Sequence, residues 1–271
     1  MDNRPIGIFD SGVGGLTAVK AIRRRLPYEE IVYFGDSGRM PYGGRPINEL
    51  LRFAEQDTGF LVGKNVKVLL AACGTTDSNA MPHLREILDR PIFGVISPAA
   101  AAAAKATKTG RIGVISTEAT TKSGAYKKAL LNVDPSLHIV AAGCPLLAAL
   151  TEHGHIGKDD PALRWPLEAY LSPIIEAGVD TLLLGCTHYP LLAAAVTDIV
   201  GTDIRLVDCG AESVGALADY LEKNDMLSGD SRTKRETYYT SGDREGFAAV
   251  AEIFLGGSIL DAVSKIEPFP L

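Results

Sequence analysis

Two cysteines of the chain stand in matching surroundings, each just after a short run of apolar residues. Cys73 follows Leu69-Leu70-Ala71-Ala72, and Cys186 follows Leu182-Leu183-Leu184-Gly185. A free thiol has a pKa of about 8.5, and a nearby cation or base increases its thiolate fraction at neutral pH. The two thiols are therefore candidates for proton transfer. The residues that follow them are small or carry hydroxyl groups: Gly74-Thr75-Thr76 and Thr187-His188.

A pair of like acid–base groups suits the inversion of a stereocentre. That reaction needs a base on one face of the carbon atom and an acid on the other, and two identical groups serve both directions. His188 lies two residues after Cys186, and Asp10 ends the first apolar run, so either side chain could manage a proton near a thiol. A lone cysteine at a strand end is more often a small packing residue, so the hypothesis depends on the pairing.

Short apolar runs alternate with longer amphipathic segments along the chain. The runs predict strands at Ile6–Phe9, Ile31–Phe34, Val66–Ala71, Ile92–Val95, Ile112–Ile115, His138–Ala142, Thr181–Leu184 and Ile204–Val207. The longer segments predict helices that include Leu16–Leu26, Ile47–Leu61, Thr121–Leu131, Leu163–Ala177, Leu191–Val200 and Ala211–Lys223. Continuous apolar strands that alternate with helices are typical of parallel sheets covered on both faces.

The eight predicted strands form two sets of four that resemble each other in the same order. The offsets drift slowly, as changes in loop length would produce, and this indicates an internal duplication. The duplication pairs Cys73 with Cys186, but it places Asp36 opposite Cys144 and Ser97 opposite Cys209. The matched residues are Ile6 and Ile112 (offset 106), Ile31 and Ile139 (offset 108), Cys73 and Cys186 (offset 113), and Ile92 and Ile204 (offset 112).

The duplication predicts an α/β fold of two similar parallel-sheet lobes with an active-site cleft between them. We assign residues 1–97 and 210–271 to the first lobe and residues 98–209 to the second. The segment from Ala211 has no counterpart and is expected to pack on the first lobe. Ligands of open parallel sheets bind beyond the carboxyl ends of the strands, so the paired cysteines would face one cleft from opposite sides.

Composition excludes several classes of function. The chain has 271 residues, 46% hydrophobic and 22% charged, which is typical of a globular protein. Its net charge of -6 and its lack of a basic patch argue against a nucleic-acid partner. The sequence shows no signal peptide and no apolar stretch of about 20 residues, so we expect a cytoplasmic protein with no membrane partner. Its 4 cysteines are too few for a disulfide scaffold.

Several motifs also have plainer interpretations. Residues 12–17 (GVGGLT) resemble a dinucleotide-binding loop, but Thr17 stands where the fingerprint requires glycine, so we expect a tight turn. His153 and His155 could join Cys186 and His188 around a metal, but no metal-binding spacing supports this and no metal is expected. Residues with an ordinary alternative role are Asp10 as a helix cap, Glu152 as a surface carboxylate and Tyr42 as a packing aromatic.

Four motifs, which together span nearly the whole chain, resemble those of glutamate racemases. They are residues 6–16 (IGIFDSGVGGL), 36–43 (DSGRMPYG), 184–191 (LGCTHYPL) and 239–243 (YTSGD), the last followed by Phe247 and Leu255-Gly256. The resemblance implies an amino-acid racemase, an isomerase that uses no cofactor and interconverts L- and D-glutamate. It further implies that the D-glutamate supplies peptidoglycan synthesis and that the protein forms a homodimer.

The resemblance also implies roles for individual residues. Cys73 and Cys186 would be the acid–base pair, with Asp10 assisting near Cys73, and His188 and Glu152 assisting near Cys186. Cys73 would take the α-proton of the D enantiomer and Cys186 that of the L enantiomer. The residues expected to contact substrate are Asp10, Ser11, Pro41, Tyr42, Gly43, Gly74, Thr75, Thr117, Thr120, Thr121, Thr187 and His188, with Thr117, Thr120 and Thr121 near its side-chain carboxylate.

One residue departs from the family pattern, and two other functions remain open. Most members have asparagine after the first cysteine, where this chain has Gly74, so backbone or water must replace a polar contact with substrate. A racemase of the same architecture that acts on aspartate would use the same cysteines, and only substrate profiling separates the two. A two-lobed amino-acid-binding protein would share the strand pattern but would leave the paired cysteines unexplained.

Overall fold

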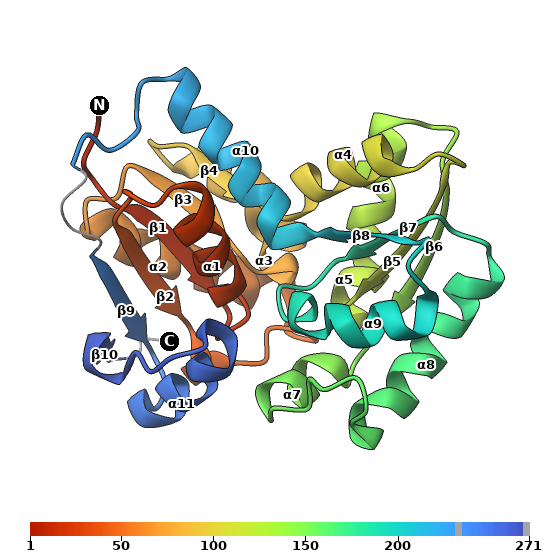
Figure 1. Cartoon of the computed structure of the whole chain (residues 1–271). Coiled ribbons are helices and arrows are strands. Elements are labelled where there is room, and N and C mark those ends of the chain that lie inside the picture. Colours follow the sequence, from red (N-terminus) through yellow and green to blue (C-terminus); the bar gives the residue numbers. More distant parts are fainter. Residues whose placement is uncertain (231–234, 268–271) are drawn as a thin grey trace.

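The computed structural model describes residues 1–230 and 235–267, whose strands form two separate parallel sheets (Figure 1). The six-stranded sheet has the order β10-β9-β2-β1-β3-β4, and the four-stranded sheet has the order β6-β5-β7-β8. The strands are β1 (Ile6–Asp10), β2 (Ile31–Gly35), β3 (Val68–Ala71), β4 (Ile92–Gly94), β5 (Arg111–Ser116), β6 (His138–Gly143), β7 (Thr181–Leu184), β8 (Arg205–Asp208), β9 (Glu236–Thr240) and β10 (Val263–Lys265).

Helices connect the strands and cover both faces of each sheet (Figure 1). The α-helices are α1 (Leu16–Arg25), α2 (Ile47–Gly63), α3 (Gly74–Ile87), α4 (Ile96–Ala106), α5 (Glu118–Ser123), α6 (Ala125–Val133), α7 (Leu147–Glu152), α8 (Pro161–Glu176), α9 (Ala193–Val200), α10 (Cys209–Lys223) and α11 (Arg244–Leu255). Short 3-10 helices are η1 (Ser37–Arg39), η2 (Tyr189–Leu192) and η3 (Leu260–Ala262). None of the helices in the described part of the chain has the length and apolar character that a membrane crossing requires.

The predicted α/β architecture with two parallel-sheet lobes is confirmed. All eight predicted strands are present, each with ends within two residues of the prediction. Strands β9 and β10 were not predicted. The predicted helix Thr121–Leu131 is wrong in one respect, because it is divided into α5 and α6. Gly124 lies between them in the left-handed region (φ 66°), a conformation that glycine adopts at little cost and that ends a helix.

Strand register supports the duplication for the first three strands of each set. Ile6 lies opposite Ile31 in the first sheet, and Ile112 lies opposite Ile139 in the second. The third strands pair equivalently, Gly7 with Leu69 and Gly113 with Leu182. Both sheets thus contain the same order of four strands, and Cys73 and Cys186 occupy equivalent positions two residues beyond β3 and β7.

At the fourth strand the predicted match is wrong by two residues. Leu69 pairs with Ile92, whereas Leu182 pairs with Leu206 rather than with Ile204. The connection before β8 is one residue longer than the one before β4, which makes the true offset 114. A slip of two residues keeps the same side chains on each face of a strand, so the apolar pattern could not reveal it. With the corrected offset, Cys209 falls opposite Val95 and not Ser97.

The C-terminal segment lies mainly against the first sheet. Strand β9 pairs with β2, and α10 and α11 pack against α1. Helix α10 also packs against α4, so it lies between the two halves of the molecule (Figure 1). The predicted lobe boundaries, after residues 97 and 209, fall within the first turns of α4 and α10 and remain a prediction.

Candidate active site

A cavity of about 560 Å³ lies where the carboxyl ends of β1, β3, β5 and β7 face one another. Side chains that follow all four strands line it, as expected for open parallel sheets. Every predicted site residue except Thr121 is in the wall. The predicted residues that line the cavity are Asp10, Ser11, Pro41, Tyr42, Gly43, Cys73, Gly74, Thr75, Thr117, Thr120, Glu152, Cys186, Thr187 and His188.

Cys73 is held at the amino end of α3. Its thiol is 3.6 Å from the Ser11 hydroxyl, and the residue is only 7% exposed. Burial and the negative charge of Asp10 raise the pKa of the Cys73 thiol, although its hydrogen bonds with Ser11 and Thr76 act in the opposite direction. In the free site Cys73 is therefore set up as a protonated thiol, which can act as an acid.

Cys186 has a different partner, an imidazole ring in a chain of hydrogen bonds. His188 Nδ1 lies 3.6 Å from Cys186 Sγ, and His188 Nε2 lies 2.7 Å from Glu152 Oε1. Burial alone would lower the pKa of His188, but the charges and hydrogen bonds of Cys186 and Glu152 raise it to about 10. At neutral pH the ring is therefore an imidazolium, and its two N–H groups face Cys186 Sγ and Glu152 Oε1.

Asp10 interacts electrostatically with Cys73 and with His188, the partner of Cys186. Its carboxylate accepts a hydrogen bond from the Gly12 backbone N–H at 2.7 Å. Burial raises the pKa of Asp10 to about 6, although the positive charge of His188 acts to lower it. The backbone N–H of Gly15, just before α1, also favours the ionised form of Asp10. Asp10 is therefore a buried carboxylate at neutral pH on the wall of the cavity.

The remaining wall can hold the two kinds of charge that an amino acid carries. Asp10 and Glu152 supply carboxylates for an ammonium group. Hydroxyl groups suited to carboxylate oxygens come from Ser11, Thr75, Thr117, Thr120 and Thr187. An added Cβ at Gly74 would meet Gly185 O and Thr120 Oγ1 at 3.4 Å, an ordinary contact distance, so a Cβ at this position would fit directly against residues of the second lobe.

Thr121 is the predicted site residue that the structure places outside the wall. Its hydroxyl lies 2.7 Å from Ser116 Oγ. Ser116 does not line the cavity, and this contact holds the Thr121 side chain against Ser116, whereas Thr117 and Thr120 line the cavity. Sequence reasoning missed other lining residues, which are Met40, Gly44, Glu118, Ala119, Lys122, Pro145, Ala148, Ala149 and Gly185. Most of these are small or carry ordinary surface side chains, so nothing in the sequence marked them.

The two histidines and the glycine loop considered above as a metal site and a nucleotide loop have structural roles. His155 Nδ1 lies 2.7 Å from Asp160, and His153 Nδ1 lies 2.8 Å from the Ala149 carbonyl oxygen. Neither histidine lines the cavity, and the described residues contain no cluster of three or more His, Cys, Asp or Glu side chains able to hold a metal ion. In the glycine loop, Gly14 lies directly against His188.

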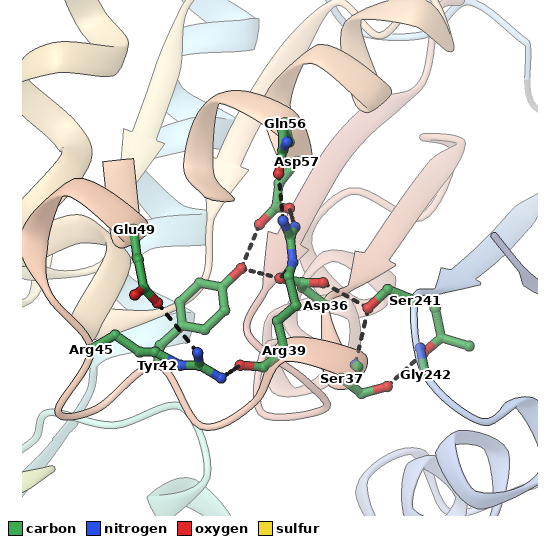
Figure 2. Close-up of polar contacts among 12 residues, drawn as sticks. Asp36, Ser37, Arg39, Tyr42, Arg45, Glu49, Gln56, Asp57, Ser241 and Gly242 are labelled. Carbon is green, nitrogen blue, oxygen red and sulfur yellow. Dashed lines mark hydrogen bonds and ion pairs between the residues drawn. The ribbon is translucent and has the colours of Figure 1, made fainter. Parts of the chain in front are cut away.

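Two sequence motifs that are far apart in the chain meet beside the cavity (Figure 2). Ser241, in the C-terminal motif, donates a hydrogen bond to Asp36 Oδ1 at 2.6 Å and accepts one from the Gly38 backbone at 3.0 Å. Asp36 begins the loop that carries Tyr42 and Gly43 into the cavity wall. The C-terminal segment therefore supports this wall from behind.

A methyl group at position 14 should impair His188. A Cβ there would lie 2.5 Å from His188 Nδ1 and 2.6 Å from Thr187 Oγ1, so Gly14→Ala must displace the ring. Because small misplacements of side chains in an active site are costly, we expect the kcat/KM of the enzyme to fall by about 10²-fold. Gly59→Ala is the matched control, because a Cβ at Gly59 meets no atom within 4 Å. Equal activity of the two variants would contradict the positioning of His188 described above.

Comparison with known proteins identifies the family. A family model described as Asp/Glu/Hydantoin racemase matches residues 44–217. A glutamate racemase from Geobacter metallireducens is 41% identical over 258 residues, covering 95% of this chain and 95% of the relative. A glutamate racemase structure from Bacillus anthracis matches with a TM-score of 0.93 at 36% identity, over 98% of each chain. One from Francisella tularensis, solved in complex with D-glutamate, matches with a TM-score of 0.90 at 31% identity, again over 98% of each.

The resemblance read from the four motifs is confirmed by these matches. They extend over almost the whole chain, and the family model covers both the β3 and the β7 cysteine positions. The chain therefore belongs to the glutamate racemase family and is a racemase, an enzyme of the isomerase class.

Proposed function

We propose that the protein interconverts L- and D-glutamate without a cofactor, with Cys73 and Cys186 as the two proton-transferring groups. The observation that carries this proposal is the placement of the two thiols. They follow equivalent strands of the duplicated sheets, and both line one cavity. Two acid–base groups on opposite walls are what inversion at the α-carbon requires.

The different partners of the two thiols fit one direction of the reaction in the free site. Cys186, beside the His188 imidazolium, removes the α-proton of L-glutamate as a thiolate. Cys73, held as a thiol, donates its proton to the opposite face and yields D-glutamate. In the reverse direction the two thiols exchange roles. Cys73 must then first lose its proton, to Asp10 or by way of Ser11, and Cys186 must gain a proton from His188.

The protein must also stabilise the carbanion that forms when the weakly acidic α-proton leaves. Negative charge develops on the α-carboxylate, and fixed hydrogen-bond donors in a water-poor site stabilise it most effectively. Thr75 and Thr187 are 5% and 2% exposed, and each lies two residues or fewer after a cysteine. We assign their hydroxyl groups, with the backbone N–H groups at the start of α3, to this task.

Removal of either hydroxyl should slow turnover. Thr75→Ala and Thr187→Ala each delete a donor to a charged group, a contact worth about 1.5–3 kcal/mol, so we expect kcat to fall by about 10- to 100-fold. Thr121→Ala is the matched control, since its hydroxyl contacts Ser116 outside the cavity. Steady-state kinetics with each enantiomer checks this, and full turnover in both cavity variants would remove these hydroxyls from the mechanism.

The cellular role and assembly follow from the family resemblance. D-glutamate made by this reaction would supply peptidoglycan synthesis and so support cell-wall biogenesis and cell shape. The enzyme would work in the cytoplasm as a homodimer, with no nucleic-acid or membrane partner.

Substrate profiling tests the proposed activity. Purified, reduced protein is incubated with D-glutamate in one cuvette and D-aspartate in another, without added cofactor, and circular dichroism follows the optical activity. Decay of the glutamate signal to zero with a stable aspartate signal is expected, and it would show that Gly74 is compatible with glutamate. Decay with aspartate alone would establish the rival substrate, and a stable signal with both would contradict the proposed activity.

A further inference from the structure

A buried polar cluster lies behind the cavity wall, where the loop after β2 meets α2 (Figure 2). Tyr42 Oη lies 2.5 Å from Asp36 Oδ2 and 2.9 Å from Asp57 Oδ2. Arg39 Nε lies 2.6 Å from Asp36 Oδ2, and Arg39 Nη2 lies 2.8 Å from Asp57 Oδ1. The side chains of Asp36 and Asp57 are both 0% exposed. Two acidic groups and one guanidinium are therefore held together away from water.

The hydrogen atoms of this cluster do not suffice if both carboxyl groups are ionised. Tyr42 has one hydroxyl proton but lies within hydrogen-bond distance of two carboxyl oxygens. Asp36 accepts from Ser241, Arg39 and Tyr42, as an ionised carboxylate does. The contact between Asp57 Oδ2 and Tyr42 Oη then needs a proton of its own, and Asp57 is the group that can supply it.

Charge balance leads to the same assignment. Two carboxylates and one guanidinium would leave a net negative charge buried, and proteins relieve such a charge by protonation. Burial, and then the negative charge of Asp36, raise the pKa of Asp57 well above its ordinary value, although Arg39 acts to lower it. A protonated Asp57 leaves a neutral cluster of one ion pair and one carboxylic acid.

The cluster is joined to the cavity through the ring of Tyr42. Tyr42, Leu50, Phe53 and Cys73 form one small apolar cluster. Phe53 lies one helical turn before Asp57 on α2, its ring centroid 5.4 Å from that of Tyr42 and 4.2 Å from Arg39 Cζ. Asp57 thus holds the hydroxyl end of Tyr42, while Phe53 packs on its ring beside the Cys73 thiol.

We propose that Asp57, as a neutral carboxylic acid, is a positioning residue that donates a hydrogen bond to Tyr42 and thereby fixes the cavity wall beside Cys73. The consequence for catalysis rests on the proposed function, because that wall would hold the substrate. The protonation state and the contact with Tyr42 do not depend on it.

Substitutions at the two acidic positions should have unequal effects. Asp57→Asn keeps the shape and the neutral charge, its amide N–H can donate to Tyr42, and its oxygen can accept from Arg39. We expect kcat/KM for glutamate within about threefold of the wild-type value. Asp57→Leu removes both contacts, so KM should rise and kcat/KM should fall by about tenfold or more. Asp36→Asn removes the ionised partner of Arg39 and should also lose about tenfold or more.

Infrared spectroscopy tests the protonation state directly. At about pH 8, where ordinary carboxyl groups are ionised, the wild-type protein should show the carbonyl band of a carboxylic acid, and Asp57→Asn should lack it. If Asp57→Leu fails to fold, Tyr42→Phe takes its place, because it removes the hydroxyl but keeps the ring, and KM should again rise. A missing band in the wild-type protein, or equal damage by Asp57→Asn and Asp57→Leu, would overturn the proposal.

The two proposals can fail separately. If the wild-type protein does not racemise glutamate, the proposed function fails, but the infrared band still decides the state of Asp57. Thermal unfolding then decides the positioning role. It should rank Asp57→Asn close to the wild-type protein and Asp57→Leu and Asp36→Asn well below it, and any other order would overturn that role.

Discussion

Cys73→Ser and Cys186→Ser should each abolish measurable racemisation of glutamate. A serine hydroxyl is a far weaker acid than a thiol, so at neutral pH it supplies no useful base to its face of the α-carbon. A positioned acid or base accelerates a reaction by about 10²- to 10⁴-fold. Each direction of the reaction needs both thiols, so we expect kcat to fall by about 10³-fold or more in either variant. Circular dichroism with either enantiomer measures the loss.

Cys144→Ser provides the matched control. Cys144 is also buried, but its thiol faces the Ala142 carbonyl oxygen at 3.6 Å, a contact that a serine hydroxyl can replace, and the residue does not line the cavity. We expect activity within about threefold of the wild-type value. Near-native turnover in either cavity variant would refute the assignment of two thiols, and an inactive Cys144→Ser would show that the assay reports only on folding.

The second large effect concerns Asp10 and the acidic side of the pH profile. Burial raises the pKa of Asp10 to about 6, and the proposed mechanism uses its ionised form. Values of kcat/KM should therefore fall about tenfold for each pH unit below 6. Asp10→Asn keeps the shape but not the charge, so we expect a loss of about 10²-fold or more at neutral pH. The fall in kcat/KM below pH 6 that protonation of Asp10 causes should be absent in this variant.

Protonation of Asp10 does not destabilise the folded protein, so acid unfolding caused by this group would not explain a loss of activity below pH 6. The folded-state pKa of Asp10 is above its ordinary value, and the same is true of Asp77, which burial also raises to about 6. Protonation of these two groups therefore favours the folded state, and that stabilisation is lost only as the pH rises through about 6. Thermal melts at pH 5 and pH 7 provide the control. A flat kcat/KM profile between these values, with the fold intact, would remove ionised Asp10 from the mechanism.

Much of the fold could be predicted because parallel strands carry a strong signal. Eight apolar runs with glycine or polar boundaries identified eight strands, and the repeated spacing identified the two lobes. Strand β9 (Glu236–Thr240) was missed because it begins with a charged residue and alternates in burial. Its partner β2 is what makes it a strand, and such pairing is not visible in local sequence.

Some residues of the candidate site could likewise be predicted from the sequence, and others could not. Residues directly after strands, such as Cys73 and Thr187, could be placed because the fold brings these positions together. Asp57 could not, because an aspartate in an amphipathic helix normally faces solvent. It is buried because Arg39 and Tyr42 reach it from a loop 15 to 18 residues earlier in the chain. Position along the sequence gives no sign of that contact.

The origin of the α-hydrogen in the product tests the two-base mechanism most directly. The wild-type enzyme is incubated with L-glutamate in deuterium oxide, and proton magnetic resonance follows the α-position at low conversion. If Cys186 removes the proton and Cys73 delivers another, the first D-glutamate formed carries deuterium, while the remaining L-glutamate keeps its protium. D-glutamate that retains its α-protium would show that one group moves the proton across both faces, and the two-thiol account would be wrong.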